Sequence, residues 1–159
     1  MRIVRATLIA VTLAILAGSQ IQAAPSSAAA GPTSCESLVS LALPHASITS
    51  AQPVAAGAFA PPGAGRGGSG RGATNPYASL PAFCRVTATL TPTSDSDIKA
   101  EVWLPASGWN GKYQAVGGGG WAGVISYPAM ATAVASGYAT SSTDTGHTGG
   151  TADFALGHP

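Results

Sequence analysis

Apolar and polar side chains alternate in two neighbouring stretches near the middle of the chain. In the first stretch Val86, Ala88 and Leu90 are separated by threonines, and in the second, residues 98–104, every second side chain is apolar. A period of two is typical of half-buried β-strands. Because residues 92–97 between them are rich in Pro, Ser, Thr and Asp, the two stretches predict a β-hairpin.

The pattern then predicts a strand, a helix and another strand. Residues 112–116 form a short strand that ends at four consecutive glycines, and residues 128–137 change to the helical period, with Pro128 suited to the first turn. Residues 138–142 predict the last strand, and the loop 143–150 follows it. This order predicts an α/β fold. A parallel sheet needs several strands with helices on both faces, so we expect the sheet to be incomplete.

The first residues have the pattern of a secretory signal peptide. Arg2 and Arg5 form a positive amino-terminal region, residues 6–17 are uncharged and apolar, and Ala23 is a small residue suited to cleavage. The apolar run is shorter than the ~18 residues needed to span a membrane, which favours cleavage over an uncleaved anchor. We therefore expect residues 1–23 to be removed and the mature protein to be secreted or periplasmic, with no membrane attachment.

Export places the two cysteines in an oxidising compartment. Cys35 and Cys84 are an even pair without the spacing of a metal site, so we expect one disulfide, worth about 4 kcal/mol on the entropic model. Residues 24–33 predict a linker of small residues, and the Gly/Pro-rich residues 57–72 predict a mobile loop. We assign residues 34–159 to a single partial domain.

Composition and charge exclude several function classes. Charged residues make up only 8% of the chain, against about 25% in an average soluble domain. Seven basic and six acidic residues give a net charge of +1, and no basic run exists, so nucleic acid is not an expected partner. The sequence has no cluster of metal-ligand spacing, so we expect no metal in this chain and assign no role to His45 or His158.

The clearest chemical signal is the run of four glycines, Gly117–Gly120, between a predicted strand and a predicted helix. Such glycines leave backbone N–H groups free to point at a negative charge near a helix N-terminus. In α/β-hydrolases the loop after the third strand supplies one half of the oxyanion hole. The same pattern also suits a flexible turn. Both interpretations remain open at this point.

Asp144 and His147 lie in the loop after the last predicted strand, where ligands bind in open α/β sheets. They are candidates for an active-site loop. No serine or cysteine has the setting of a nucleophile, which favours an orienting or structural role for this pair over direct catalysis. The Gly-x-Ser-x-Gly elbow is absent: Ser69 follows Gly67 at the required spacing, but Arg71 occupies the place of the second glycine.

Several segments, in this order, resemble the tannase and feruloyl esterase family. They are residues 83–86, 96–105, 109–112, 117–123 and 142–147. The resemblance extends from about Cys35 to the end of the chain. It implies a secreted, disulfide-bonded α/β-hydrolase that cleaves esters of hydroxylated aromatic acids, of which this chain is the amino-terminal part: hairpin, strand, oxyanion loop, helix and strand.

Carried onto this sequence, the resemblance makes Gly119 and Gly120 the oxyanion contributors and makes Cys35–Cys84 the amino-terminal disulfide of the family. The serine, aspartate and histidine of the family's catalytic triad match no residue here, nor does its calcium-bearing lid. We therefore expect a feruloyl- or galloyl-type serine esterase in complete form, with a small aromatic ester as substrate. The chain by itself is expected to be inactive.

An alternative from another class is a small exported binding module without catalysis. Trp103, Trp109 and Trp121 would then be exposed stacking surfaces for aromatic or sugar ligands. The order of the motifs argues against this alternative.

Overall fold

A computed structural model describes residues 33–63 and 75–157 of the 159-residue chain. The expected signal peptide, all but the last residue of the expected linker, residues 64–72 of the expected loop and His158 lie outside the described residues. Within the described ranges, no helix combines the length and the hydropathy needed to cross a lipid bilayer.

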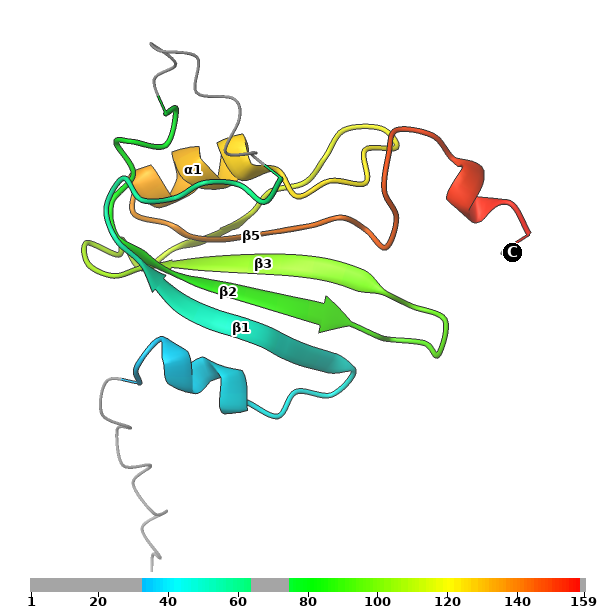
Figure 1. Cartoon of the computed structure of the whole chain (residues 1–159), viewed down its shortest axis with the longest axis horizontal. Helices are drawn as coiled ribbons and strands as arrows, with labels where there is room; N and C mark the ends of the chain where they lie inside the picture. The colour runs from blue at the N-terminus through cyan, green and yellow to red at the C-terminus, as the bar shows by residue number, and fades with distance from the viewer. Residues whose placement is uncertain (1–32, 64–74, 158–159) are drawn as a thin grey trace, which may run out of the picture. The chain divides into compact units, whose positions relative to one another are not determined.

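The described part of the chain contains one mixed sheet, one α-helix and two short 3-10 helices (Figure 1). The elements, in chain order, are η1 (Glu36–Ser40), β1 (Ala46–Val54), β2 (Phe83–Leu90), β3 (Ile98–Pro105), β4 (Tyr113–Ala115), α1 (Tyr127–Ala135), β5 (Ala139–Thr143) and η2 (Asp153–Ala155). The strand order in the sheet is β1-β2-β3-β5-β4, and among these neighbours β4 and β5 are parallel while the others are antiparallel. The α/β fold class predicted from the sequence is therefore confirmed.

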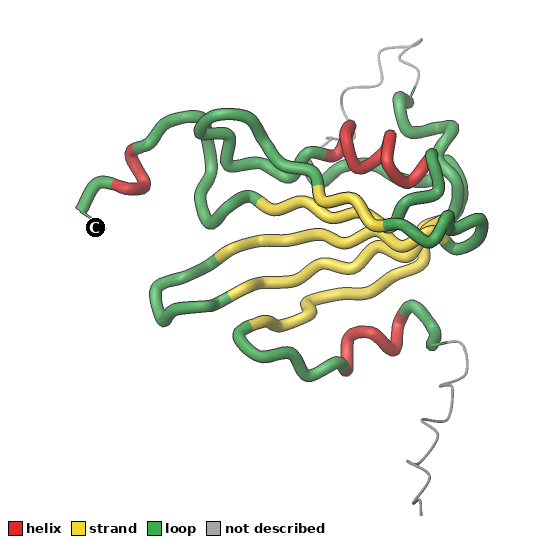
Figure 2. The backbone as a smooth tube through the Cα atoms, turned by 180° about the vertical axis from the view of Figure 1, so that it is seen from behind, coloured by secondary structure: helices red, strands yellow, loops and turns green. Residues whose placement is uncertain are grey.

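The predicted hairpin is present as β2 and β3. Leu90 pairs with Ile98 next to the turn, and Phe83 pairs with Pro105 at the other end of the ladder. The strands lie side by side along their whole length (Figure 2). Pro105 is accepted as the last residue of its strand, where a missing backbone N–H costs least.

The predicted strand, helix and strand form a crossover from β4 through α1 to β5. Pro128 lies in the first turn of α1, and Met130 and Val134, four residues apart, are buried against the sheet. Gly137 follows the helix with φ +79°, and a Cβ at this position would lie 2.8 Å from the Gly108 carbonyl oxygen. Glycine is therefore required here both by the backbone conformation and by the close approach of the preceding turn.

Strand β1 was not predicted from the sequence. Its residues are mostly small, so the alternation of burial along it leaves only a weak period of two in hydropathy, and Ala51 is its one buried residue. Pro53 also argues against a strand, yet β1 lies at the edge of the described sheet, where proline is tolerated. A register shift between Ile48 and Ser50 interrupts the ladder, and the Thr49 hydroxyl instead forms a hydrogen bond of 2.7 Å with that of Thr87.

Aromatic side chains form the centre of the core. Trp103 is fully buried, with its ring centroid 4.4 Å from that of Phe83 and 4.5 Å from that of Phe59. This corrects the alternative in which Trp103 is an exposed stacking surface. Phe59 comes from the first part of the expected Gly/Pro-rich loop, and the Gly57 N–H donates to the Leu80 carbonyl at 3.0 Å. The described start of that loop, residues 57–63, is therefore attached to the core by one buried ring.

A buried carboxylate joins two strands to the helix. Glu101 is 3% exposed, and its Oε2 accepts hydrogen bonds from Arg85 Nε at 2.8 Å and from Trp103 Nε1 at 3.0 Å. Its Oε1 accepts from the Tyr127 hydroxyl at 2.9 Å and from Arg85 Nη2. Alternation along β3 would place Glu101 and Trp103 in solvent, but α1 and Phe59 cover that face.

The first prediction concerns this ion pair. Replacing Arg85 by Met leaves the Glu101 carboxylate buried without its cation, and we expect the free energy of unfolding to fall by about 3 kcal/mol. Urea unfolding at neutral pH measures the change. Lys99→Met is the matched control because the ion pair of Lys99 with Asp97 is exposed, so less than about 1 kcal/mol is expected. Equal losses in the two variants would contradict the assigned role.

A second prediction concerns alkaline pH. Burial, followed by the Glu101 carboxylate, raises the pKa of Tyr127 from 10.0 to about 12. The neutral phenol therefore stabilises the folded state fully below about pH 10, and this contribution is lost as the pH rises through about 12. Tyr127→Phe has no such group, so the stability advantage of the unsubstituted protein over this variant should shrink between these pH values. A constant difference in urea unfolding would contradict the raised pKa.

Candidate functional site

Two loops meet where β4 and β5 end. We call residues 117–123 the glycine loop and residues 144–150 the His147 loop. Because β4 and β5 are parallel neighbours, the loops that follow them leave the same edge of the sheet, where open α/β sheets bind ligands. The Gly123 N–H donates to the Gly149 carbonyl at 2.8 Å, which links the two loops directly.

The four consecutive glycines of the glycine loop, Gly117–Gly120, are exposed. Within the part of the chain that the structure describes, neither the Gly119 N–H nor the Gly120 N–H donates a hydrogen bond to a protein acceptor. Gly120 has φ +58°, which favours glycine. The Gly119 carbonyl accepts from the Ala122 N–H at 3.3 Å. Residues 121–126 separate these glycines from α1, so the glycines do not belong to the first turn of the helix.

Asp144 organises the start of the His147 loop. Its Oδ1 accepts hydrogen bonds from the Lys99 N–H and the Gly146 N–H, both at 2.9 Å, and its own N–H donates to the Lys99 carbonyl at 3.0 Å. Among the hydrogen bonds of the described residues, none joins the Asp144 carboxylate to the His147 ring. The structure therefore places both residues in one loop but does not form a carboxylate–histidine pair, and the geometry of Asp144 is that of a structural turn residue.

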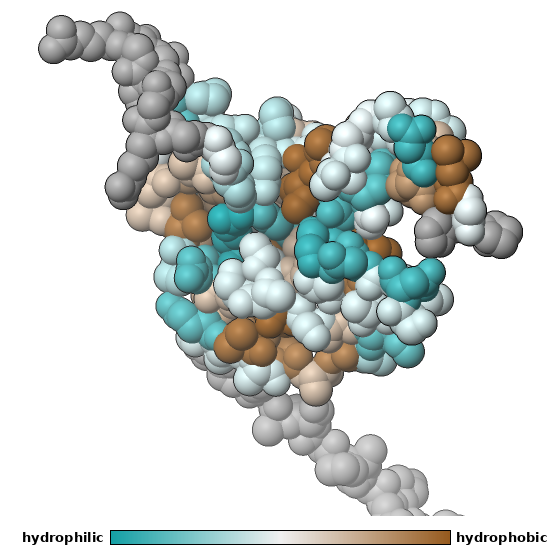
Figure 3. Space-filling view, turned by 45° about the vertical axis from the view of Figure 1, so that its right-hand side comes forward, coloured by the Kyte–Doolittle hydropathy of each residue, from teal (hydrophilic) through white to brown (hydrophobic). Residues whose placement is uncertain are grey.

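The His147 ring contacts the glycine loop. Its Nε2 lies 2.9 Å from the Trp121 carbonyl oxygen, and its Nδ1 lies 3.1 Å from the Thr145 hydroxyl. The ring stacks on Phe154 of η2 at a centroid distance of 3.9 Å, and Phe154 also contacts Trp121 edge to face at 6.3 Å. Trp121 and Phe154 are both exposed, and apolar surface is visible near the C-terminal end of the described residues (Figure 3). Phe154 is not predictable as part of the site from the sequence, because no spacing connects it to Trp121 and His147.

Gly123 permits the close approach of the two loops. A Cβ at this position would lie 2.6 Å from the His147 Cδ2 and 2.7 Å from the His147 carbonyl carbon. Real Cβ atoms do not approach other heavy atoms so closely, so a side chain here would push the loops apart. The sequence does show Gly123, close after the four glycines, but nothing in the pattern indicates that it faces His147.

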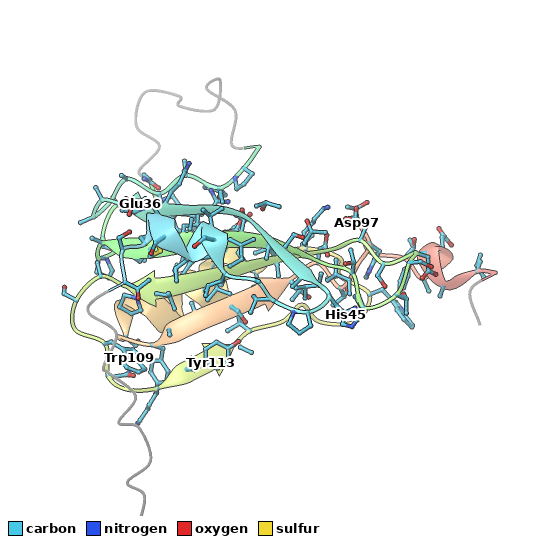
Figure 4. All side chains as sticks on the ribbon, turned by 90° about the horizontal axis from the view of Figure 1, so that it is seen from below. Glu36, His45, Asp97, Trp109 and Tyr113 are labelled. Carbon is cyan, nitrogen blue, oxygen red and sulfur yellow. A yellow bond between two sulfur atoms is a disulfide. The ribbon has the colours of Figure 1, made fainter. Side chains whose placement is uncertain are left out.

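The other predicted residues lie elsewhere. Cys35 and Cys84 form the predicted disulfide, with a Cα–Cα distance of 5.6 Å, which connects the start of η1 to β2. Trp109 is exposed, lies near Tyr113 of β4 and donates from Nε1 to the Lys112 carbonyl at 2.9 Å (Figure 4). Glu36 of η1 lies toward the other edge of the sheet (Figure 4).

The possible metal ligands of the described residues do not cluster. Among the residues that the structure describes, no three His, Cys, Asp or Glu side chains lie together as metal ligands. The calcium implied by the family resemblance belongs to the lid of the complete family member, which matches no residue here, and we derive no step through it.

Comparisons with known proteins agree with one another. Residues 84–159 match the family model described as "Tannase and feruloyl esterase". An uncharacterized esterase of Xanthomonas campestris pv. campestris is 43% identical over 133 residues, which cover 82% of this chain and 21% of that protein. A probable feruloyl esterase B-1 of Aspergillus oryzae is 41% identical over 78 residues, which cover 49% of this chain and 14% of that protein.

Solved structures show the same relationship. The crystal structure of feruloyl esterase B from Aspergillus oryzae superposes with a TM-score of 0.62 at 29% identity and covers 75% of this chain and 22% of that one. An esterase from the same organism gives a TM-score of 0.58 at 26% identity, with coverages of 72% and 22%. The chain thus spans about a fifth or less of the length of the curated relatives described above.

A third prediction tests the packing of the two loops. Gly123→Ala should lower the free energy of unfolding by about 1–3 kcal/mol, because the added methyl group meets the His147 backbone and weakens the Gly123–Gly149 hydrogen bond. Gly119→Ala is the matched control: a Cβ at Gly119 meets nothing within 4 Å, and we expect a change within about 0.5 kcal/mol. Urea unfolding of both variants measures the difference, and similar stabilities would argue against a tight contact.

Proposed function

Because the chain belongs to the tannase and feruloyl esterase family through residues 84–159, we propose that it supplies the oxyanion half-site of an exported esterase for hydroxylated aromatic acids. The expected substrates are feruloyl- or galloyl-type esters, and the reaction is acyl transfer to a serine followed by hydrolysis. Secretion, the serine mechanism and the choice of aromatic acid are all part of this proposal.

The proposal rests on the N–H groups of Gly119 and Gly120, which have no acceptor among the residues that the structure describes. They follow β4, which together with α1 and β5 forms the crossover unit. In α/β-hydrolases one oxyanion donor comes from the loop between the third strand and its helix. Backbone donors in this position stabilise the negative charge that develops on the carbonyl oxygen of the ester in the transition state.

In the proposed reaction the serine Oγ forms a bond to the acyl carbon while its proton passes to a histidine. The carbonyl oxygen becomes an oxyanion, which accepts hydrogen bonds from the glycine loop, and the alcohol leaves with the proton from that histidine. Water then attacks the acyl-enzyme and releases the aromatic acid. The serine elbow and its triad partners are absent from the 159 residues, so we propose that they belong to sequence outside this chain.

The surroundings of the glycine loop suit an oxyanion. The carboxylate of the His147 loop, Asp144, accepts one backbone hydrogen bond from Gly146 in its own turn and one from Lys99 of β3, which partly neutralise its charge. Trp121, which directly follows the glycines, is 56% exposed and offers an aromatic face for stacking. A ring next to the oxyanion donors favours an aromatic acyl group.

A non-catalytic binding module remains a second candidate because Trp109 and Trp121 are both exposed. It needs only the indole faces and no anion-binding N–H groups. The two functions therefore differ in whether a ligand must carry a negative charge.

The fourth prediction distinguishes the oxyanion half-site from the non-catalytic binding module. Ferulate, whose carboxylate places a negatively charged oxygen on the acyl carbon as the oxyanion does, should shift the backbone amide signals of Gly119 and Gly120 in a ¹H–¹⁵N NMR titration of the 159-residue chain. Gly119→Pro removes one N–H and should weaken this binding about tenfold, as expected for the loss of about 1.4 kcal/mol. Gly119→Ala keeps the N–H and should bind ferulate like the unsubstituted chain.

Coniferyl alcohol, which has the same ring but no carboxylate, is the control ligand. Equal binding of the alcohol and the acid would favour the binding module and contradict the oxyanion assignment. In the complete product of the gene, Gly119→Pro should lower kcat for methyl ferulate by about 10²–10³. The unsubstituted 159-residue chain alone should show no hydrolysis above that of buffer.

A further inference from the structure

We propose that His147 is a positioning residue whose ring holds the glycine loop by its Trp121 carbonyl and so sets the direction of the Gly119 and Gly120 N–H groups. This inference rests on the proposed function of those glycines as oxyanion donors. It assigns the imidazole to the geometry of the site and not to proton transfer.

The first support is the pattern of contacts along the glycine loop. At its start, the Val116 N–H donates to the Ser141 carbonyl at 2.8 Å, and at its end Gly123 bonds to Gly149. Between these two points, the His147 ring is the one side chain among the described residues that forms a hydrogen bond with the loop. The bonded carbonyl belongs to Trp121, the residue next to Gly120.

The second support is that the ring is held firmly itself. It stacks on Phe154 with an interplanar angle of 15°, and its Nδ1 contacts the Thr145 hydroxyl. Thr145 adopts φ +56°, and the Asp144 carboxylate binds the Gly146 N–H to stabilise this turn. The ring is therefore held by Thr145, close after β5, and by Phe154 of η2, in addition to its contact with the glycine loop.

The third support is the composition of the loop. Four consecutive glycines have large backbone freedom and no side chains to pack, and one backbone hydrogen bond of 3.3 Å, from Ala122 to Gly119, is formed within the described loop. Catalytic donors need placement within about 0.5 Å. A hydrogen bond from a rigid ring to the residue next to Gly120 restricts the peptide groups on which the proposed donors lie.

The protonation of the ring follows from its partner. A carbonyl oxygen only accepts, so Nε2 carries a hydrogen and donates to Trp121. Both the neutral Nε2–H tautomer and the imidazolium can make this bond. Because Nε2 is engaged in this way, the geometry does not place His147 as the base that accepts a proton from a nucleophile.

Two variants of the 159-residue chain test the inference. His147→Phe keeps a flat ring that can stack on Phe154 but has no N–H, whereas His147→Gln carries an amide N–H near the position of Nε2. ¹⁵N relaxation reports the backbone order of Gly119 and Gly120, and ferulate titration reports the affinity of their N–H groups. Urea unfolding reports any general loss of structure.

With the unsubstituted chain near an order parameter of about 0.85 at both glycines, His147→Phe should lower it below about 0.6. The same variant should weaken ferulate binding about tenfold with little change in the urea midpoint, and His147→Gln should restore most of both losses. Unchanged order in His147→Phe, or failure of His147→Gln to restore it, would overturn the proposal. If ferulate does not bind the unsubstituted chain, the oxyanion assignment fails, while the relaxation data still decide the role of His147 in holding the loop.

Discussion

The rest of the fold depends on one buried carboxylate. Glu101 lies on β3 beneath α1, and an ionised carboxylate in such a place is tolerated only because every strong acceptor site has a donor. Arg85 supplies two of them from β2, and Trp103 and Tyr127 supply one each. The network therefore fixes the hairpin, the central indole and the first residue of the helix with respect to one another. The aromatic core, in which Phe59 packs on Trp103, forms around this arrangement.

The start of α1 connects the Glu101 network to the candidate site. The Ser126 N–H, directly before the helix, donates to the buried Ser142 hydroxyl of β5 at 3.0 Å. The glycine loop is thus held at its start by Ser141 of β5 and at its end by Gly149 of the His147 loop. Its middle carries the Gly119 and Gly120 N–H groups, which donate to no acceptor among the described residues. Firm ends and a free middle are what an anion-binding backbone segment requires, because the donors need to be available and also fixed in direction.

The glycines from Gly119 to Gly137 differ in how much space surrounds them. At Gly123 and Gly137 it is required because another backbone segment lies where a Cβ would be. At Gly119 space is open, so a side chain would fit and only the N–H matters to the proposed chemistry. The glycine loop is therefore not a uniform flexible segment: Trp121 and Gly123 contact the His147 loop, whereas the space around Gly119 is open. These contacts bear on the choice between a flexible turn and an anion-binding loop, which the sequence leaves open.

The sequence by itself determined the hairpin, the short strand before the glycines, the helix and the final strand, because each has a local period of hydropathy or a local turn signal. It also determined the pairing of Cys35 with Cys84, since no other cysteine exists, and the family. It did not determine β1, whose small residues show no clear period, or the burial of Glu101 and Trp103, because the face of a strand that becomes buried depends on which element packs there. Only the tertiary structure decided that His147 contacts the carbonyl of Trp121, since two segments 26 residues apart meet through the parallel pairing of β4 and β5, a long-range contact that leaves no local pattern.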